Sequence, residues 1–329
     1  MKSWWIMRGD RKPHDDWELP PPPSWRSFAE QGDRDERGAT FQIEEHEVDL
    51  INTAMLLRRP LLVTGAPGTG KSSLAFAIAH ELKLEPVLYW PINSRSTLHE
   101  GLYDYDAIGR LQETSVQQAL APGGADAEHS GKSAEQVGPP DIGPYIRLGA
   151  LGTALLPSDR PRVLLIDEID KGDIDLPNDL LHIFEEGRCT IRELDRFAER
   201  QPEAEVRTAD PDGRAIIAAG KIRCRAFPIV VLTSNGERDF PPPFLRRCLQ
   251  LNLHQPDEEK LARIVEAHLG PQVRQQAADL ISEFLRRREQ NILATDQLLN
   301  AVYLQVSGAG KDPGDLNELL DSLLHSLGR

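Results

Sequence analysis

The sequence predicts an α/β chain in which helices cover a parallel sheet, followed by a small all-helical unit. Three observations indicate this class. The apolar runs 61–63 and 163–166 lack polar alternation, as expected for strands covered on both faces. The first run leads directly into a glycine-rich loop and then a helical segment. From residue 256 onward, apolar residues recur at the spacing of amphipathic helices.

Composition narrows the class of protein. The chain has 329 residues, which suggests two or three structural units, and its hydrophobic content of 40% is sufficient for a buried core. Asp and Glu number 52 against 38 Lys and Arg, which gives a net charge of −14. Such a surface repels phosphate backbones, so the composition argues against a dedicated nucleic-acid binder.

The sequence carries no signal for export or membrane insertion. It has no apolar run of the length that a transmembrane helix needs, and the apolar part of its first residues is too short for a signal peptide. Cys189, Cys224 and Cys248 are scattered without metal-ligand spacing, as is typical of a reducing compartment. We expect a cytoplasmic protein with no membrane contact and no structural zinc.

The glycine-rich loop spans residues 65–72, with the sequence GAPGTGKS. It fits G-x-x-x-x-G-K-[ST] at every fixed position, and it lies between the apolar run and a helix predicted over 73–82. Glycines allow backbone N–H groups to turn toward phosphate oxygens, and the helix directs its positive end at the same anion. Lys71 supplies a charge for the β- and γ-phosphates, and the Ser72 hydroxyl is placed to ligate Mg²⁺. A chance glycine turn is the alternative, and the flanking strand and helix argue against it.

A second apolar run ends in two acids, Asp167 and Glu168. Asp167 can hold Mg²⁺, and Glu168 can orient and polarise an attacking water. Acids at a strand end before a helix N-terminus are also common for structural reasons, but the phosphate loop upstream favours the functional interpretation. The sequence therefore predicts ATP and Mg²⁺ as cofactors, with Ser72 and Asp167 as metal ligands. The expected cofactor-binding residues are Gly65, Ala66, Pro67, Gly68, Thr69, Gly70, Lys71, Ser72, Ser73 and Asp167.

A third predicted strand, 227–232, ends in Thr233, Ser234 and Asn235. A polar residue at the tip of a strand between the loop strand and the acid strand can contact the γ-phosphate or the water. A simple turn is the alternative for this sequence. The adjacent Arg246 and Arg247 follow; they are either surface charge or an arginine finger that reaches the nucleotide of the next subunit.

The first 38 residues contain four of the five tryptophans (Trp4, Trp5, Trp17 and Trp25) and a run of four prolines. Indoles along an extended segment would not stay in water. The segment is either a strap that buries them against the nucleotide-binding core, which we favour, or a docking arm for a neighbouring subunit or partner. The two interpretations are compatible.

The remaining segments complete the predicted order of elements. Further predicted elements are an amphipathic helix within 41–57, a strand over 86–92, a Gly/Ala/Ser/Pro-rich loop or insertion over 122–144, a helix over 176–186 and a short hairpin over 215–222. Beyond residue 256, four apolar faces predict four helices: 261–269, 277–284, 298–302 and 316–327.

The combination of these motifs resembles the AAA+ ATPases and, within them, the MoxR branch. The resemblance spans residues 38 to 329 and is carried by GAPGTGKS (65–72), NSRSTLHEGLYDYDAIGRLQ (93–112), VLLIDEIDKGDIDLPNDLLHIFEEG (163–187) and VLTSNGERDFPPPFLRRC (231–248). It implies a P-loop NTPase core of three αβα layers with a parallel sheet, followed by an all-α lid. The implied division is a Trp/Pro-rich arm (1–38), a nucleotide-binding core (39–255) with a helix-2 insertion (93–143), and a lid (256–329).

The resemblance also implies roles for individual residues. Asp167 and Glu168 form the Walker B pair, and Asn235 is sensor 1. Arg247, with Arg246 beside it, fills the arginine-finger position, and Asn93 loosely matches a polar residue that restrains the catalytic glutamate. The implied catalytic residues are thus Glu168, Asn235, Arg246 and Arg247. Two features depart from the pattern: residues 293–296 contain no sensor 2 arginine, and the tryptophan-rich arm is not general in the superfamily.

The function implied by the resemblance is ATP hydrolysis with Mg²⁺ in a homo-oligomeric, hexameric ring, coupled to chaperone-like remodelling of a protein partner. MoxR-like proteins are associated with partners that carry a von Willebrand factor A domain, so we expect such a partner. Alternatives are a DNA-directed AAA+ motor and an ATP-gated scaffold in a signalling or defence system. A small-molecule kinase also uses a phosphate loop, but the arginine pair and the helical unit argue against it.

Overall fold

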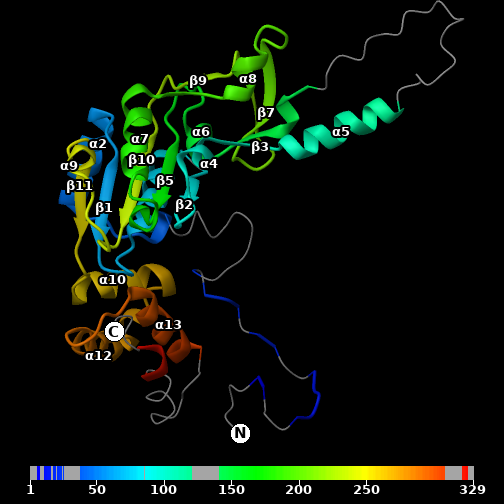
Figure 1. Cartoon of the computed structure of the whole chain (residues 1–329). Coiled ribbons are helices and arrows are strands. Elements are labelled where there is room, and N and C mark those ends of the chain that lie inside the picture. The colour runs from blue at the N-terminus through cyan, green and yellow to red at the C-terminus, as the bar shows by residue number, and fades with distance from the viewer. Residues whose placement is uncertain are drawn as a thin grey trace, which may run out of the picture.

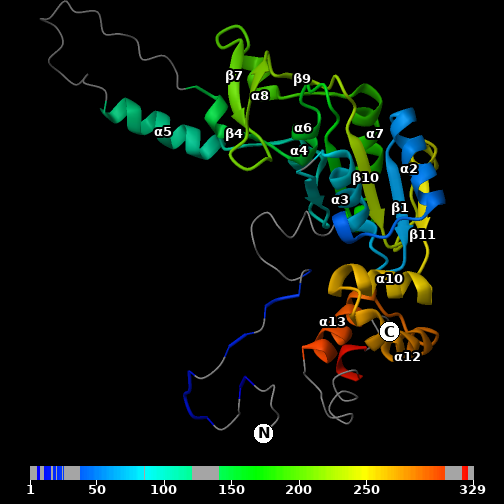
Figure 2. The ribbon, with the colours of Figure 1, turned by 180° about the vertical axis from the view of Figure 1, so that it is seen from behind.

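The computed structural model describes most of the chain. The described residues are 6–7, 11–15, 18–19, 21–23, 25, 38–84, 86–120 (for 117–120 the backbone alone), 141–307 and 321–324. Trp4, Trp5 and Trp17, the insertion residues 121–140 and most of the predicted helix 316–327 lie outside this set. Figures 1 and 2 show a sheet flanked by helices, a second group of strands beside it and a cluster of helices beneath it.

The central sheet of the described chain is parallel and has five strands in the order β11-β1-β10-β5-β2. The strands predicted at 61–63, 86–92, 163–166 and 227–232 are confirmed as β1, β2, β5 and β10. Strand β10 lies between β1 and β5. The edge strand β11 was not predicted. The strands are β1 (Leu61–Gly65), β2 (Leu88–Pro91), β5 (Val163–Asp167), β10 (Ile229–Ser234) and β11 (Leu249–Leu253).

Alternate residues of the strands pack on opposite faces of the sheet, as the pleat requires. Leu61 and Val63 join an apolar cluster with Leu74 of α3, whereas Leu62 joins a second cluster with Leu180 of α7. The result is the predicted three-layer α/β core. The helices of this part are α2 (Glu45–Leu57), α3 (Lys71–Leu82), α6 (Ala150–Ala154), α7 (Leu176–Glu186) and α9 (Pro242–Leu245), with the 3-10 turn η4 (Ile169–Lys171).

A second, six-stranded sheet of short strands stands beside the core in the described residues, in the order β3-β4-β7-β8-β9-β6. The predicted hairpin over 215–222 is present as β8 and β9, but the rest of this sheet was not predicted. Helix α5 projects from it in Figure 1. The elements are α4 (Leu98–Leu102), β3 (Tyr103–Tyr105), α5 (Ala107–Leu120), η3 (Gly143–Tyr145), β4 (Ile146–Leu148), β6 (Arg188–Thr190), α8 (Arg192–Phe197), β7 (Glu203–Arg207), β8 (Arg214–Ala218) and β9 (Lys221–Arg223).

The C-terminal helices form a lid with its own apolar cluster, centred on Leu261, Phe284 and Leu298. Three of the predicted faces correspond to α10, α12 and α13, and Leu324 from the fourth also joins the cluster. The lid helices are α10 (Glu258–Leu269), α11 (Val273–Gln276), α12 (Ala278–Arg288) and α13 (Thr295–Val306). We retain the division into arm, core and lid at residues 38 and 255 as a proposal.

Trp25 packs against the lid, not against the core as the strap prediction had it. Its indole N–H donates to Oδ1 of Asn300 over 2.9 Å, and its ring meets His268 and Tyr303 edge-on. The lid offers an acceptor and two aromatic rings at one place, which satisfies both the polar tip and the apolar body of the indole.

Within the described residues, no helix is long and apolar enough to cross a bilayer.

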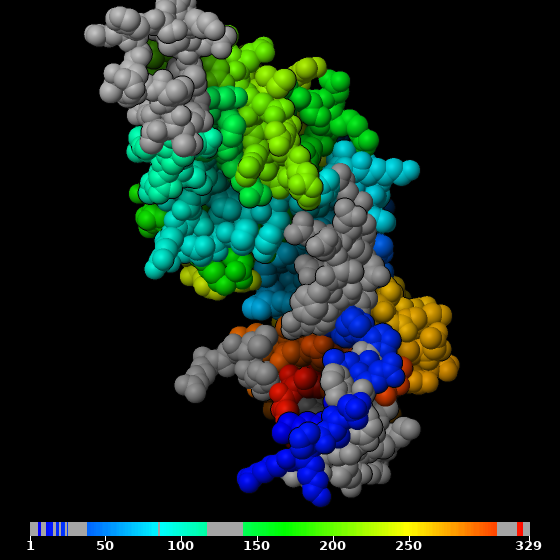
Figure 3. All heavy atoms as spheres, turned by 90° about the vertical axis from the view of Figure 1, so that its right-hand side faces the viewer, coloured from blue at the N-terminus to red at the C-terminus, as the bar shows by residue number. Residues whose placement is uncertain are grey.

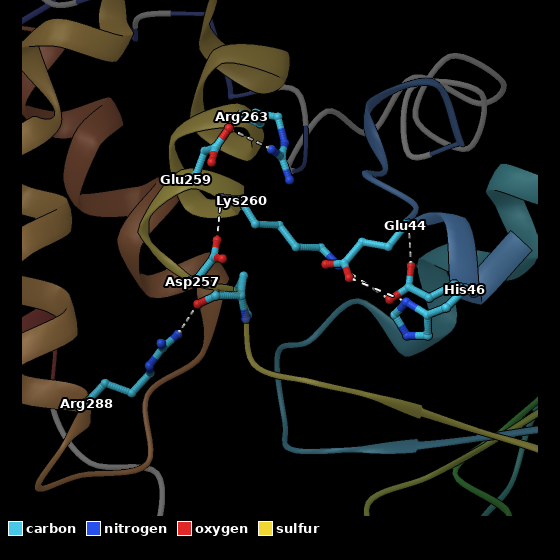
Figure 4. Close-up of polar contacts among 9 residues, drawn as sticks. Glu44, His46, Asp257, Glu259, Lys260, Arg263 and Arg288 are labelled. Carbon is cyan, nitrogen blue, oxygen red and sulfur yellow. Dashed lines mark hydrogen bonds and ion pairs between the residues drawn. The ribbon is translucent and has the colours of Figure 1, made fainter.

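A buried ion pair joins the lid to the core. Lys260 of α10 extends toward α2, as Figure 4 shows, and its Nζ lies 2.8 Å from Glu44 and 3.4 Å from Glu47. The Glu47 side chain is only 2% exposed, and that of Lys260 is 12% exposed. The Lys260 ammonium lowers the pKa of Glu44 through a hydrogen bond and its charge. A carboxylate buried this deeply depends on its cation, so Lys260 fixes the lid against α2.

Replacing Lys260 with Met therefore tests this junction. We expect Lys260→Met to lower the free energy of unfolding by about 3 kcal/mol, because it leaves the Glu47 carboxylate buried without a cation. Adding Glu47→Gln to that variant should recover most of the loss. Urea denaturation measures both variants, with Glu44→Gln as the control at the more exposed carboxylate. A double variant as unstable as Lys260→Met alone would show that charge does not govern the junction.

Candidate nucleotide-binding site

The phosphate loop lies at the carboxyl edge of the sheet, between β1 and α3. Gly68 and Gly70 have φ angles of +75° and +87°, which side chains rarely tolerate. A Cβ at Gly68 would lie 2.3 Å from that of Ala294 in the lid, and one at Gly70 would lie 2.7 Å from the Phe41 ring. Both glycines are thus required by conformation and by close neighbours, and the loop is in contact with the lid.

Lys71 is folded back on the loop that it serves. Its Nζ donates to the carbonyls of Gly65 (2.8 Å) and Ala66 (3.0 Å), and the residue is only 7% exposed. Burial lowers the pKa of Lys71, and the nearby carboxylates, Asp170 first among them, oppose that shift. The loop thus holds a buried ammonium at the position where a phosphate would be received.

Asp167 at the end of β5 is the centre of a hydrogen-bond cluster. Its Oδ1 accepts from the hydroxyls of Ser72 and Thr233, each over 2.6 Å, and its Oδ2 accepts from the Tyr89 hydroxyl over 3.2 Å. A hydroxyl and a carboxylate side by side at a phosphate loop form the hard oxygen set that Mg²⁺ prefers. The residues present therefore fit the metal that the sequence predicts, and Ser72 and Asp167 would hold it.

Glu168 has a left-handed backbone conformation, which the amino-acid sequence does not predict. Its φ and ψ are 59° and 48°, the left-handed region that non-glycine residues avoid at a cost of about 1 kcal/mol. Its N–H donates to the Thr233 hydroxyl over 2.8 Å, which holds this turn in place. Strain of this kind concentrates at functional sites.

The Glu168 carboxylate is held by two neighbours. Lys171 lies 2.8 Å from one oxygen, and the pKa of Lys171 is raised by this hydrogen bond. The Asn235 amide donates to the other oxygen over 3.5 Å. Asn93 has a different use, since its side-chain oxygen accepts from the N–H of Arg95 in its own turn. The structure thus places Asn235 beside Glu168.

Asp170 was not singled out by the sequence reasoning. It is 5% exposed, and its Oδ2 accepts from the backbone N–H groups of Asn235 (3.0 Å) and Glu237 (3.1 Å). Its other carboxylate oxygen has no hydrogen-bond partner in the described part of the chain. The sequence does contain a signal for this residue, because Asp170 is the third acid after the apolar run 163–166. Asp170 positions the loop that carries Asn235.

Arg246 and Arg247 lie at the opposite edge of the sheet from the loop. They precede β11, whose first residue, Leu249, pairs with the first residue of β1, Leu61. A strand of five residues, at about 3.3 Å per residue, then separates them from Gly65 by roughly 15 Å. Within one chain the arginines therefore do not approach the phosphate loop.

The two arginines differ in their surroundings. Arg247 forms an ion pair with Glu185 of α7 and donates to the Pro243 carbonyl over 3.2 Å. Arg246 is exposed, and among the described residues its guanidinium has no hydrogen bond or ion pair. Arg246 is therefore the arginine that is already available to another molecule.

A cavity of about 520 Å³ opens between the loop and the lid. This volume suits a small organic ligand. Its walls come from the segment before α2, the loop, and helices α10 and α13. The lining includes Thr40, Phe41, Gln42, Gly68, Thr69, Gly70, Ser73, Lys260, Ile264, Thr295 and Leu299, with Trp25 from the arm.

Comparison with protein families identifies this arrangement. Residues 60–248 match the model of the AAA domain of the dynein-related subfamily, which is more than half of the chain. The chain belongs to this AAA family. The match begins just before the phosphate loop and ends at Cys248, so it includes Lys71, Asp167, Glu168 and Asn235. The AAA domain binds nucleotide and, in general, hydrolyses ATP. A search of curated proteins gave no match.

Asp170 of the AAA domain provides a test of the site geometry. We expect Asp170→Ala to lower ATP turnover about tenfold or more while leaving ATP affinity within a few-fold, because it releases the N–H groups that fix the Asn235 loop. Asp170→Asn, which keeps an acceptor, should lose less. Steady-state hydrolysis and nucleotide titration measure the two effects, with the exposed Asp173→Ala as control. Unchanged turnover in Asp170→Ala would remove Asp170 from this role.

Proposed function

We propose that the chain is a MoxR-type AAA+ ATPase that binds ATP with Mg²⁺ and hydrolyses it at a site completed by a neighbouring copy. The observation that carries this proposal is the convergence on Asp167. Its carboxylate joins the Ser72 hydroxyl after Lys71 to the Thr233 hydroxyl, and Glu168 follows directly. Phosphate binding and water activation are thus held by one cluster.

The residues of the chain divide the chemistry among them. Lys71 leaves the carbonyls of its own loop to neutralise the β- and γ-phosphates, which are better partners for an ammonium. When bound by Ser72 and Asp167, Mg²⁺ would supply charge neutralisation at the phosphates. Glu168, released from Lys171, polarises the water that attacks the γ-phosphorus, and Asn235 orients it. The Asn235 contact to Glu168 supports this pairing of roles.

The positions of the arginines support a ring. Arg246 and Arg247 lie at the sheet edge opposite to the loop of their own chain, which favours a contact with the nucleotide of another copy. An arginine delivered in this way contributes about 10³- to 10⁵-fold to turnover. We propose a closed homo-oligomer that is a hexamer, as the resemblance to the MoxR branch implies. Its hydrolysis of ATP depends on assembly.

We propose a cytoplasmic protein partner with a von Willebrand factor A domain. A surface that supports a protein partner is the apolar side of α5, where Ile108 and Leu111 are 70% and 68% exposed. Helix α5 projects from the second sheet, so this surface is accessible from outside the core. Exposed apolar residues grouped on one helix favour protein contact.

Glu168→Gln tests the proposed hydrolysis. We expect the variant to bind ATP as the unaltered chain does and to turn it over at least about 100-fold more slowly, because the amide cannot polarise water as a carboxylate does. Phosphate release and nucleotide titration measure this, with Glu237→Gln at the neighbouring exposed acid as the control. Normal turnover in Glu168→Gln would contradict the assignment.

Single arginine variants test the trans contact. We expect Arg246→Ala to leave ATP binding intact and to reduce turnover of the assembled protein about 10³-fold or more, because its exposed guanidinium is available to a neighbour. Arg247→Ala should lose less, since this side chain is paired with Glu185. Turnover measured against protein concentration, with assembly followed by light scattering, distinguishes the two. Normal turnover in a variant that carries both substitutions would show that neither arginine acts on the nucleotide of a neighbouring copy.

A further inference from the structure

One residue of the N-terminal arm is fixed to the lid. Trp25 joins the apolar cluster of the lid, donates its indole N–H to Asn300 and contacts His268 and Tyr303 at centroid distances of 5.7 and 6.1 Å. The Tyr303 hydroxyl also donates to the Pro21 carbonyl. Figure 3 shows the described arm residues, in blue, beside the orange and red atoms of the lid. The contacts involve specific hydrogen bonds, so this position is defined.

The same indole lines the cavity between loop and lid. At one end of this cavity the loop offers backbone N–H groups and Lys71 lies nearby, which suits phosphates. The rest of the wall mixes polar side chains, among them Gln42 and Thr295, with an apolar and aromatic part formed by Phe41 from the core, Ile264 and Leu299 from the lid, and Trp25. A nucleotide has the same division, with an anionic end and a flat aromatic base.

We propose that Trp25 forms part of the base-binding wall of this cavity, so that the N-terminal arm contributes directly to nucleotide affinity. This inference rests on the proposed nucleotide-binding function and adds a residue to its site. The base of a bound nucleotide lies against the indole, while its phosphates occupy the loop. Aromatic side chains stack on nucleobases, and because every base has a π-face this stacking does not require a particular base.

A consequence is that nucleotide binding and arm docking support each other. Trp25 is attached to α13 and α10, whereas Phe41 lies against Gly70 of the loop. A ligand between these two aromatic residues bridges arm, lid and core. Since coupling between binding events is reciprocal, an arm that is docked raises nucleotide affinity and a bound nucleotide holds the arm.

The experiment compares ADP with inorganic pyrophosphate, which has the same number of phosphates but neither the base nor the ribose. Calorimetric titration with Mg²⁺ is made on the full chain and on Trp25→Ala, Trp25→Phe and Leu19→Ala. We expect Trp25→Ala to weaken ADP binding about 5- to 100-fold and to leave pyrophosphate binding within twofold. Trp25→Phe should retain most of the ADP affinity. Leu19, which is 65% exposed in the arm, is the control and should have no effect.

Each other outcome is decisive. Equal loss of ADP and pyrophosphate binding in Trp25→Ala would show that Trp25 only stabilises the lid, and unchanged ADP binding would show that it does not face the base. Either result overturns the inference while leaving the nucleotide function intact. Failure of the unaltered chain to bind ADP or ATP would instead overturn the proposed function, and this inference with it.

Discussion

The carboxylate of Asp167 is the constraint on which the rest of the site depends. It ends a strand whose apolar residues are fully buried, and such an acid is costly unless it is bonded. The hydroxyls of Ser72 and Thr233 bond to the same oxygen over 2.6 Å, so the phosphate loop, β5 and β10 meet at one atom. The Thr233 hydroxyl also receives the N–H of Glu168, which holds that residue in its left-handed conformation. One cluster thus fixes both the proposed metal ligands and the proposed base.

The two edges of the parallel sheet carry different functional groups. The carboxyl edge gathers the phosphate loop, the acids and Asn235, and the lid closes over it through the Lys260–Glu47 ion pair and the Gly68–Ala294 contact. The amino edge carries Arg246 and Arg247. A parallel sheet cannot bring its two edges together, so a site that needs both acids and arginines requires two copies of the chain. Under the proposed function, assembly is then a condition for turnover.

Local chemistry made much of this predictable from sequence. β1, β5 and β10 begin as continuous apolar runs and lead into glycine, an acid or polar residues, and their common edge follows from parallel packing. Strand β11 was missed although Leu249, Leu251 and Leu253 alternate with polar residues, because five residues give a weak period. The second sheet consists of strands of three to five residues that only tertiary pairing defines. Contacts between residues that are distant in the sequence determine the φ angle of Glu168, the hydrogen bonds of Asp170 to the N–H groups of Asn235 and Glu237, and the position of Trp25.

Metal binding by the Asp167 cluster can be measured directly. Mn²⁺, as a spectroscopic substitute for Mg²⁺, can be titrated by electron paramagnetic resonance in the presence of saturating ATP, for the unaltered chain, Asp167→Asn and Tyr89→Phe. We expect Asp167→Asn still to bind ATP but to lose Mn²⁺ affinity about tenfold or more, since an amide replaces the anionic ligand. Tyr89→Phe, which removes a neighbour of the same carboxylate, should keep the metal. Equal Mn²⁺ affinity in the unaltered chain and in Asp167→Asn would show that the Asp167 carboxylate does not hold the metal.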